Sequence, residues 1–473
     1  MLTITHYAVS VCLPTLLLIS PLDAQECIED HQCDLVMSCH PGLHGVLEGG
    51  PTLVPPRTGG IQSLGNWNVE SLQVNGPTSN RIDLVFVGDG YTTQEINTFA
   101  PRADAALEEL FEYEPFTSYR SFFNAHRVDV ISPEAGVDND PDQGIERNTA
   151  LNMAFWCANI ERLLCVDVNS AQAAAALAPD FDQIFAVANS EKYGGAGYTQ
   201  AEIGTFSSDN SQSTQVAIHE LGHSLGNLAD EYTYGGPSEW PNSEPGTSNL
   251  STYQDAQMSS LQAKWHLWLG YTQPGIGTHS TYEGGGYSET GIFRPTSNSM
   301  MRELSQPFNM PSQEGLIIEF YQTVMLIDSQ SPVSTNAPFS SILSINCVEP
   351  LHGLEYSWFI NGSPLPGATG SSLDLDTVPA LQPGDVVAVE TIDMTTMVRN
   401  ETNRLLYMSE GRSWIIDAPQ GDPGDFNSDG VVNGADLGIL LSSFGSTGPV
   451  GDLNGDNLVD GSDIGLLLSA WTP

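Results

Sequence analysis

Apolar runs and polar turns alternate through the first two thirds of the chain in a pattern typical of strands and helices. Arg81–Gly88 (RIDLVFVG), Phe123–Ile131 and Asp182–Ala188 are mostly apolar runs with the length of buried strands. Thr98–Tyr113 and Ala171–Leu177 are predicted helices. The first of these helices has an apolar face made of Phe99, Ala103, Ala106, Leu107 and Leu110. Strands separated by helices predict an α/β (α+β) domain with a mixed sheet.

The pattern changes after about residue 328, where short strands alternate with turn residues as far as Asp417. The strand signals are SILSINCV, LEYSWFING, SSLDLDTV, DVVAVETI, RLLYMS and SWIID. Their spacing is typical of a small Ig-like β-sandwich, and Trp358 is expected in its core. A linker rich in Gly, Pro and Asp then leads to the last fifty residues.

The N-terminal residues resemble a signal peptide. Ala8–Ser20 is mostly apolar but too short to span a membrane, and Ala24 offers a small residue for cleavage. We therefore expect a secreted protein without a membrane span. The segment that follows is rich in Gly and Pro and reads as an extended lead-in. The predicted parts are a signal peptide at 1–24, the lead-in at 25–75, the α/β domain at 76–328, the sandwich at 329–417 and a tail at 418–473.

The charge balance is strongly acidic, with 14 Lys and Arg against 58 Asp and Glu and a formal net charge of −44. Nucleic acid is excluded as a partner because phosphate binding needs clustered cations. We interpret the acid excess chiefly as a solubility feature.

Six cysteines remain after the predicted signal peptide: Cys27, Cys33, Cys39, Cys157, Cys165 and Cys347. An even number in an exported chain favours disulfides, although six cysteines allow fifteen pairings. Cys157 and Cys165 flank a short segment that reads as helical, and they are the best candidates for one bridge. Buried free thiols are the alternative.

The chemistry-bearing motif is His219-Glu220-Leu221-Gly222-His223, an HExxH sequence. On a helix, residues four apart share a face, so both imidazoles can reach one metal ion with Glu220 beside it. Imidazole nitrogens suit zinc, which lowers the pKa of a bound water toward ~7. Glu220 can take the proton of that water as it attacks a carbonyl. The alternative is an ordinary histidine pair on a helix, which the apolar approach Val216–Ile218 disfavours.

The segment VAIHELGHSLGNLADEY resembles the active-site region of the IgA-peptidase family of bacterial metallopeptidases. The likeness covers roughly residues 75 to 330. Its further motifs are Gly88–Thr92, Asn124–Val130, Ser132–Gly136, Asn189–Gly195, Trp265, Glu283–Gly285, Arg294-Pro295 and Ser299–Arg302. The resemblance implies a metzincin-like zinc peptidase fold, with Met300 or Met301 in a turn beneath the metal.

The third zinc ligand departs from the common metzincin pattern, because the expected position holds Ala229, which cannot coordinate. Asp230 is the first candidate, since a carboxylate is an acceptable ligand and a loop one residue longer delivers it. Glu231 is the second candidate and Glu283 the third, and Asp230 as a partner that orients a histidine is a further option. Tyr232 and Tyr234 are candidates for stabilising an oxyanion, although packing is the commoner role of tyrosine.

The tail contains two loops in the same register, 27 residues apart. Side-chain oxygens recur at positions 1, 3, 5, 9 and 12, and position 7 supplies a backbone carbonyl, as in calcium loops. The predicted ligands are Asp425, Asn427, Asp429, Val431, Asn433 and Asp436 in the first loop, and Asp452, Asn454, Asp456, Leu458, Asp460 and Asp463 in the second. Asn457 replaces the usual Gly at position 6, which a left-handed Asn tolerates. An acidic tail without metal is the alternative.

Each loop precedes an apolar helix and resembles a dockerin repeat, which implies a small helical domain with two calcium ions. It also implies a cohesin-like or cell-surface protein as partner. We therefore predict a secreted zinc-dependent metalloendopeptidase that acts on extracellular proteins. The alternative is a catalytically inactive adhesion protein, against which the intact His219, Glu220 and His223 speak. A carbohydrate-active enzyme has no support from the sequence.

Overall fold

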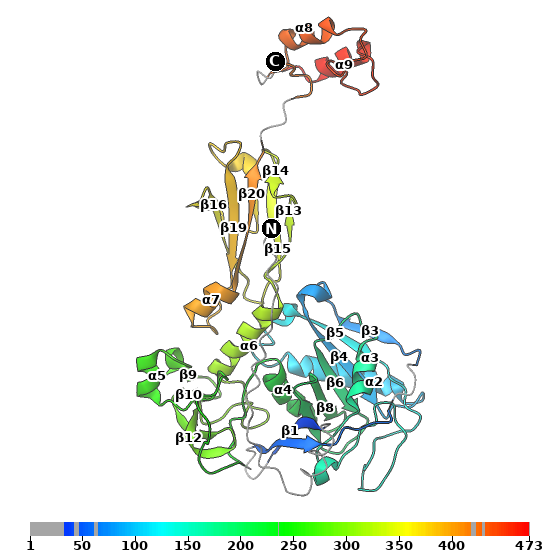
Figure 1. The fold of residues 1–473 in the computed structure, drawn as a ribbon, viewed down its shortest axis with the longest axis vertical. Coiled ribbons are helices and arrows are strands. Elements are labelled where there is room, and N and C mark those ends of the chain that lie inside the picture. The colour runs from blue at the N-terminus through cyan, green and yellow to red at the C-terminus, as the bar shows by residue number, and fades with distance from the viewer. Residues whose placement is uncertain are drawn as a thin grey trace. The chain divides into compact units, whose positions relative to one another are not determined.

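The computed structural model describes residues 33–41, 47–60, 65–234, 236–417, 422–427 and 431–472 (Figure 1). The predicted signal peptide lies outside them. The chain forms two compact units, and each is discontinuous in sequence. The first comprises residues up to Leu326 together with Val348–Leu354 and Asp393–Ser409, and the second comprises Ile327–Cys347, Glu355–Ile392 and the residues from Glu410 onward.

An eight-stranded mixed sheet with the order β2-β1-β7-β8-β6-β4-β5-β3 forms the centre of the first unit. Its parallel core is made of β4 (Ile82–Asp89), β5 (Phe123–Val128), β6 (Gln183–Ala188) and β8 (Ile203–Ser207). The first three of these strands confirm the three apolar runs. β7 (Gly195–Tyr198) runs antiparallel to β8, and β3 (Val69–Gln73) runs antiparallel to β5.

A hairpin extends this sheet on the side of β7. It consists of β1 (Asp34–Pro41) and β2 (Leu47–Val54), and β1 pairs antiparallel with β7. Val36, Leu47 and Val54 are buried. These residues come from the segment predicted to be an extended lead-in. The structure differs because these residues pair with each other and β1 pairs with β7, a partner far along the chain that no local pattern reveals.

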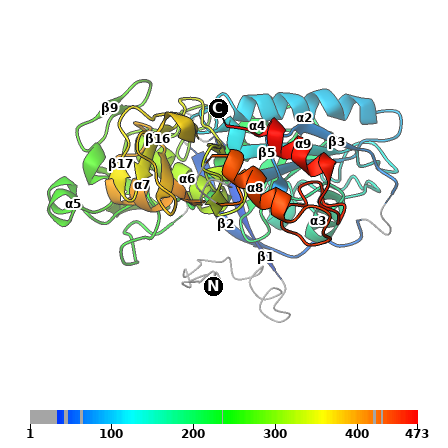
Figure 2. The same ribbon diagram turned by 90° about the horizontal axis from the view of Figure 1, so that it is seen from above.

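Helices cover both faces of the sheet. α2 (Ile96–Leu110) buries the five apolar residues that the helical spacing predicts. It contacts α4 (Ser213–Ser224), whereas α3 (Val168–Ala175) packs on β4 and β6 with its alanines in the opposite core. Figure 2 shows α2 and α3 on opposite sides of the strands. α4, which carries the HExxH motif, packs against β7 and β8.

The rest of the first unit consists of shorter elements. They are α5 (Asp255–Leu261), the pair β9 (Thr272–Gln273) and β10 (Gly277–Thr278), the pair β11 (Tyr282–Gly285) and β12 (Ser288–Arg294), α6 (Met310–Thr323) and α7 (Glu401–Tyr407). Single 3-10 turns occur at Thr78–Asn80, Arg120–Phe122, Cys157–Asn159 and His266–Trp268, with one more at Leu375–Thr377 in the second unit. Among the described residues, no helix is long and apolar enough to cross a membrane.

The predicted strand RLLYMS was wrong, because α7 occupies most of it. Asn400 caps this helix by accepting a hydrogen bond from the Asn403 backbone N–H. Arg404 is buried and donates to the backbone carbonyls of Asp393, Thr395 and Val398. The periodicity of so short an apolar run cannot distinguish a helix from a strand. Here the Asn400 cap and the buried Arg404 guanidinium stabilise the helix.

A buried carboxylate joins the three chain segments of the first unit. Asp393 accepts hydrogen bonds from the Tyr119 and Tyr321 hydroxyls at 2.5 and 2.7 Å, and His352 Nε2 lies 2.7 Å from its other oxygen. Burial by itself raises the pKa of Asp393, but these partners outweigh it and lower that pKa below the ordinary value. The segments 348–354 and 393–409 are thus integral to the unit.

Two smaller sheets make up most of the second unit. One has the order β13-β15-β18 and the other β14-β20-β19-β16-β17. The strands are β13 (Ile327–Ser331), β14 (Asn336–Ala337), β15 (Ile342–Cys347), β16 (Glu355–Ile360), β17 (Ser363–Pro364), β18 (Ser372–Asp374), β19 (Val386–Ile392) and β20 (Ser409–Ile416). Trp358 is buried, as predicted, and stacks against Trp414 with ring centroids 6.1 Å apart.

The C-terminal residues form two short helices, α8 (Gly434–Ser442) and α9 (Gly461–Ser469). Their buried core consists of Val432, Leu440, Val459 and Leu467. A core of four side chains is small, so this part gains little free energy of folding from apolar burial.

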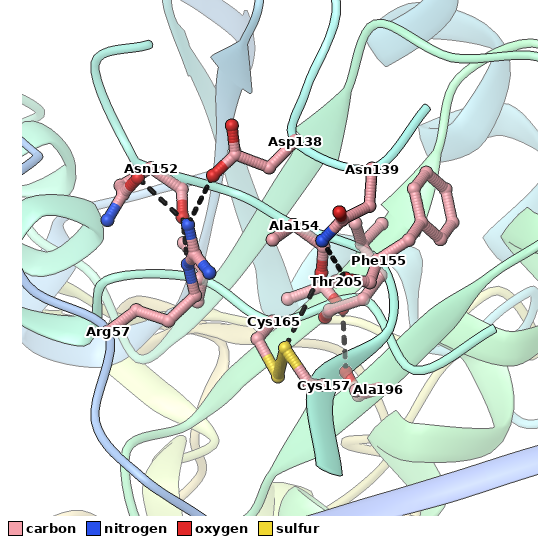
Figure 3. Close-up of a disulfide and its surroundings, with 12 residues drawn as sticks. Arg57, Asp138, Asn139, Asn152, Ala154, Phe155, Cys157, Cys165, Ala196 and Thr205 are labelled. Atoms are coloured by element: carbon pink, nitrogen blue, oxygen red, sulfur yellow. Dashed lines mark hydrogen bonds and ion pairs between the residues drawn. A yellow bond between two sulfur atoms is a disulfide. The ribbon is translucent and has the colours of Figure 1, made fainter. Parts of the chain in front are cut away.

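The predicted bridge between Cys157 and Cys165 is confirmed (Figure 3). The segment between them is not the helix that its sequence suggests. Only a 3-10 turn forms at Cys157–Asn159, because Ala158 and Asn159 both adopt left-handed backbone. Backbone hydrogen bonds in both directions between Ala154 and Cys165 close the loop beside the disulfide.

Candidate metal centre

The HExxH motif lies on α4, and the whole motif is buried. His219, Glu220 and His223 have exposed fractions of 0 %, 3 % and 9 %. The apolar residues of the helix, including Val216 and Ile218, anchor it in the core. Such burial of three ionisable groups is costly unless they bind each other or a metal.

Asp230 joins the two histidines from the loop that follows α4. Its Oδ1 lies 3.0 Å from His219 Nε2 and 3.2 Å from His223 Nε2, and the two Nε2 atoms are 3.1 Å apart. Asp230 is itself 2 % exposed. Among the described residues, these three form the only group of His, Cys, Asp or Glu close enough to share a metal ion.

Backbone carbonyls orient both imidazoles. His219 Nδ1 lies 3.0 Å from the Met300 carbonyl oxygen, and His223 Nδ1 lies 2.7 Å from that of Leu228. A carbonyl can only accept, so each Nδ1 carries a hydrogen, and a neutral imidazole in this tautomer has its lone pair on Nε2. Both Nε2 atoms therefore face the carboxylate of Asp230, where they can bind a shared proton or a metal ion.

This donor set fits zinc. Two neutral imidazole nitrogens and one carboxylate oxygen are a known ligand combination for catalytic zinc, which keeps a fourth position open. Ligand atoms ~2.0–2.1 Å from a tetrahedral ion lie about 3.4 Å from one another. The observed separations of 3.0–3.2 Å need only a small outward shift to reach that value.

The other proposed ligands lie outside the group. Glu231 is buried, and it accepts hydrogen bonds from Asn249, Ser299 and Asn309. Glu283 lies on β11 with an exposed side chain, which accepts from the Gly291 backbone N–H. The structure thus brings Asp230 to the histidines and gives Glu231 a place in a separate polar network.

Tyr287 is a site residue that the sequence pattern missed. Its hydroxyl donates a hydrogen bond to Asp230 Oδ2, and its ring makes an edge contact with Tyr232. Of the two tyrosines that the sequence suggested, Tyr232 is buried at this contact and Tyr234 is 57 % exposed. The three glycines at 284–286, just before Tyr287, are the sequence feature that could have pointed to this residue, because such a run indicates a turn or a close approach of the backbone.

The charges within the site are strongly coupled. Burial alone would raise the pKa of Asp230 and lower that of His223. The ion pair reverses both effects, so the pKa of Asp230 falls well below its ordinary value and the pKa of His223 rises to about 9. A proton held on His223 competes with a metal ion, and metal binding must therefore release it.

Gly197 of β7 makes room for the Glu220 carboxylate. A Cβ atom at this position would overlap Glu220 Oε2 and lie 2.7 Å from its carboxyl carbon. The backbone of Gly197 is not in the left-handed region, so only space requires a glycine here. β7 therefore passes directly over the group predicted to act as the base.

We expect Gly197→Ala to lower turnover by about 10- to 100-fold while the fold and zinc content stay unchanged, because a methyl group would push the carboxylate from its place. Gly204→Ala is the matched control. Gly204 lies opposite Gly197 on β8, and a Cβ there would make ordinary contacts of 3.6 Å and more. Steady-state kinetics and zinc analysis of both variants test this. Equal turnover of the two variants would show that Gly197 does not position Glu220.

Residues 70–279 match the model of the family described as IgA Peptidase M64. The matched region contains the HExxH motif, Asp230 and Gly197, but neither the β1–β2 hairpin nor Tyr287. The resemblance noted from the motifs is confirmed for this region. A comparison with curated proteins found no match.

Proposed function

We propose that the IgA peptidase M64 family domain at residues 70–279 acts as a zinc-dependent endopeptidase on extracellular proteins. The observation that carries this proposal is the convergence of His219, His223 and Asp230, whose ligand atoms lie within 4.8 Å of one another. The family name is not evidence for immunoglobulin as substrate, because no described feature of the site encodes such a preference.

Each residue has a role in this chemistry. Zinc, when bound, polarises a carbonyl and acidifies water. Glu220 follows His219 on the same buried helix and accepts the proton of the attacking water, which it then delivers to the leaving amine. The Met300 and Leu228 carbonyls hold the imidazoles in the tautomer that exposes Nε2. Tyr287 holds Asp230 by donating its hydroxyl hydrogen to Oδ2.

A metzincin-like fold belongs to the same proposal. Support comes from the chain around Met300 and Met301, which lies directly beneath α4. Besides the His219 contact, the Met301 sulfur lies where a Cβ at Gly222 would clash, at 2.6 Å. Both methionines are fully buried. Export to an oxidising compartment is likewise proposed, from the signal-like N-terminus and the Cys157–Cys165 disulfide.

Removing zinc should abolish hydrolysis of a general protein substrate, and adding zinc back should restore it. The assay uses the full chain, both intact and after limited cleavage with trypsin, before and after dialysis against a chelator, with metal content measured in parallel. An adhesion protein without catalytic activity would show zinc but no hydrolysis in either form. Hydrolysis that survives complete removal of the metal would contradict the proposed mechanism.

We also propose that the C-terminal tail binds two calcium ions. The second loop supports this, because its backbone folds around its own carboxylates. Asp463 Oδ1 accepts hydrogen bonds from the backbone N–H groups of Leu453 and Asn454. The Asp452 carboxylate accepts from those of Gly455 and Asn457. Asn457 has a φ of 68°, as the position-6 turn requires. In the first loop, Asp436 likewise accepts from Asn427, while residues 428–430 lie outside the described residues. A cohesin-like or cell-surface partner for this tail is part of the proposal.

The isolated tail, residues 422–473, should gain helical structure only when calcium is added. Its core is small and its loops concentrate carboxylates, so calcium binding supplies folding free energy by relieving their repulsion. Circular dichroism during a calcium titration measures the effect, with magnesium as the control ion. Equal helicity in excess chelator would contradict it. Proteolysis by a chain that ends near Asp417 should be unaffected.

A further inference from the structure

The metal centre is closed to a polypeptide in this structure. The motif residues and Asp230 have exposed fractions of 9 % or less. An endopeptidase must place the bond that it cuts next to the metal and the base. Some part of the molecule that now covers the site must therefore move before a protein substrate enters.

The β1–β2 hairpin lies against the metal centre on two sides. β1 pairs with β7 in the register Met37 to Gly197, and Gly197 is the residue that lies over Glu220. β1 also contacts α4 itself. On β2, Gly50 lies beside the Tyr287 ring: a Cβ atom on Gly50 would be 3.4 Å from the nearest ring carbon. The Leu47 N–H donates to the Arg302 carbonyl, just after Met300 and Met301.

Without β1, β7 would be the edge strand of the central sheet. Extended peptides bind to such edges by adding a strand, with main-chain hydrogen bonds for affinity. A peptide paired with β7 would pass Gly197 and so present its backbone to Glu220 and the metal ligands. β1 takes that place and pairs antiparallel with β7.

We propose that the β1–β2 hairpin, residues 34–41 and 47–54, is inhibitory: it occupies the substrate-strand position on β7 and keeps the peptidase latent. This proposal rests on the proposed peptidase function. Besides the Leu47–Arg302 hydrogen bond, the hairpin is held by the buried side chains of Val36, Leu47 and Val54 and by the pairing of Met37 with Gly197. It is therefore attached through contacts that can be broken without unfolding the parallel core of the sheet.

Arg57 marks the point at which the hairpin can be detached. It is the first Lys or Arg in the entire sequence, and it follows β2 by three residues. Its guanidinium pairs with Asp138 at 2.6 Å and donates to the Asn152 carbonyl (Figure 3). Thr58 and Gly59 are exposed. Once Arg57 leaves these partners, an arginine-specific peptidase can add water across the Arg57–Thr58 bond, which leaves a carboxylate on Arg57 and an ammonium group on Thr58.

The test compares the zinc-loaded full chain before and after brief treatment with trypsin, which is then inhibited. N-terminal sequencing identifies the product that begins at Thr58. Thr58→Pro is the matched control, because trypsin does not cut before proline and Arg57 keeps its partners. We expect cleavage to raise the rate of protein hydrolysis about tenfold or more. This is the gain that results if the site is open in ~10 % or fewer of the uncut molecules and in nearly all of the cut ones. The Thr58→Pro protein should stay at the uncut level.

The rate at which a small chelator removes zinc provides a readout independent of activity. We expect faster removal after cleavage of the wild-type chain, and no change in Thr58→Pro. Faster removal without hydrolysis would support the inhibitory position of the hairpin while contradicting the proposed peptidase function. Full hydrolysis by the uncut chain, with unchanged zinc removal after cleavage, would overturn the hairpin proposal and leave the peptidase function intact.

A second variant releases the hairpin without a protease. Val36 is fully buried, so Val36→Asp should expel β1 and raise hydrolysis by the uncut chain. Thr52→Asp, on the same hairpin but only partly buried, is the control and should have little effect. Hydrolysis that falls in Val36→Asp, while cleavage of the wild-type chain also brings no gain, would show that the hairpin is merely structural.

Discussion

Glu220→Gln should reduce protein hydrolysis by at least ~10²–10⁴-fold while zinc content and fold remain those of the wild type. Glutamine has nearly the same shape but cannot accept the proton of the attacking water. The residue lies on α4 directly after one metal ligand, and its carboxylate points toward Gly197 rather than into the His219–Asp230 group. The substitution therefore removes the base and leaves the ligands in place.

The measurement uses both the intact chain and the chain cut after Arg57, so that an inhibitory hairpin cannot mask the comparison. Glu289→Gln is the control, because Glu289 lies exposed on β12. Zinc analysis and circular dichroism accompany the kinetics. Turnover near the wild-type level in a pure Glu220→Gln sample would rule out the assigned role of this carboxylate.

Asp230→Ala should weaken zinc binding by at least ~10²-fold, since even residues that only orient a ligand are worth ~10–100-fold in affinity. Within the described part of the chain, Asp230 is the one carboxylate whose oxygen lies near both imidazoles. Its loss would also leave the Tyr287 hydroxyl without this acceptor. Competition with a chelating dye measures the affinity directly, without reference to activity.

Two variants separate coordination from general damage. Glu283→Ala should keep full zinc affinity, because its exposed side chain lies outside the ligand group. Glu231→Ala removes the acceptor of three buried hydrogen bonds and should chiefly lower thermal stability. If Asp230→Ala retained zinc while Glu231→Ala lost it, the third ligand would be misassigned.

Local periodicity predicted the centre of the first unit well. The three runs that became β4, β5 and β6 are buried along their whole length, and their apolar residues lie on both faces, as expected of parallel strands covered on both sides; β5 also buries the polar residues Asn124, His126 and Arg127. The face of α2 could be predicted residue by residue, because a helix on a sheet buries one stripe. Both signals lie within a single element and need no knowledge of its partners.

The hairpin and α7 could not be predicted in this way. The glycines and prolines of β1 and β2 indicate a loop, and their pairing depends on β7, which lies more than a hundred residues away. α7 depends on the burial of Arg404 against carbonyls of the preceding loop. In both elements, contacts distant from the local pattern decide the conformation.

The same distinction holds for the site. His219, Glu220 and His223 follow from helical spacing alone, and Asp230 was the first choice among three carboxylates. Choosing between Asp230 and Glu231 required the polar network around Asn249, Ser299 and Asn309, which only the folded chain assembles. Tyr287 and Gly197 reach the site from other elements, so no spacing within the motif points to them.

The three side-chain contacts of Asp393, with Tyr119, Tyr321 and His352, determine when the first unit can finish folding during synthesis. The first unit requires His352 and Asp393, and its last segment ends at Ser409, beyond most strands of the second unit. A chain emerging from a ribosome therefore cannot complete this unit until about residue 409 is free. Until Asp393 has emerged, Tyr119 and Tyr321 lack the acceptor that they bury in the finished fold, so the peptidase matures late, after most of its length has been synthesised.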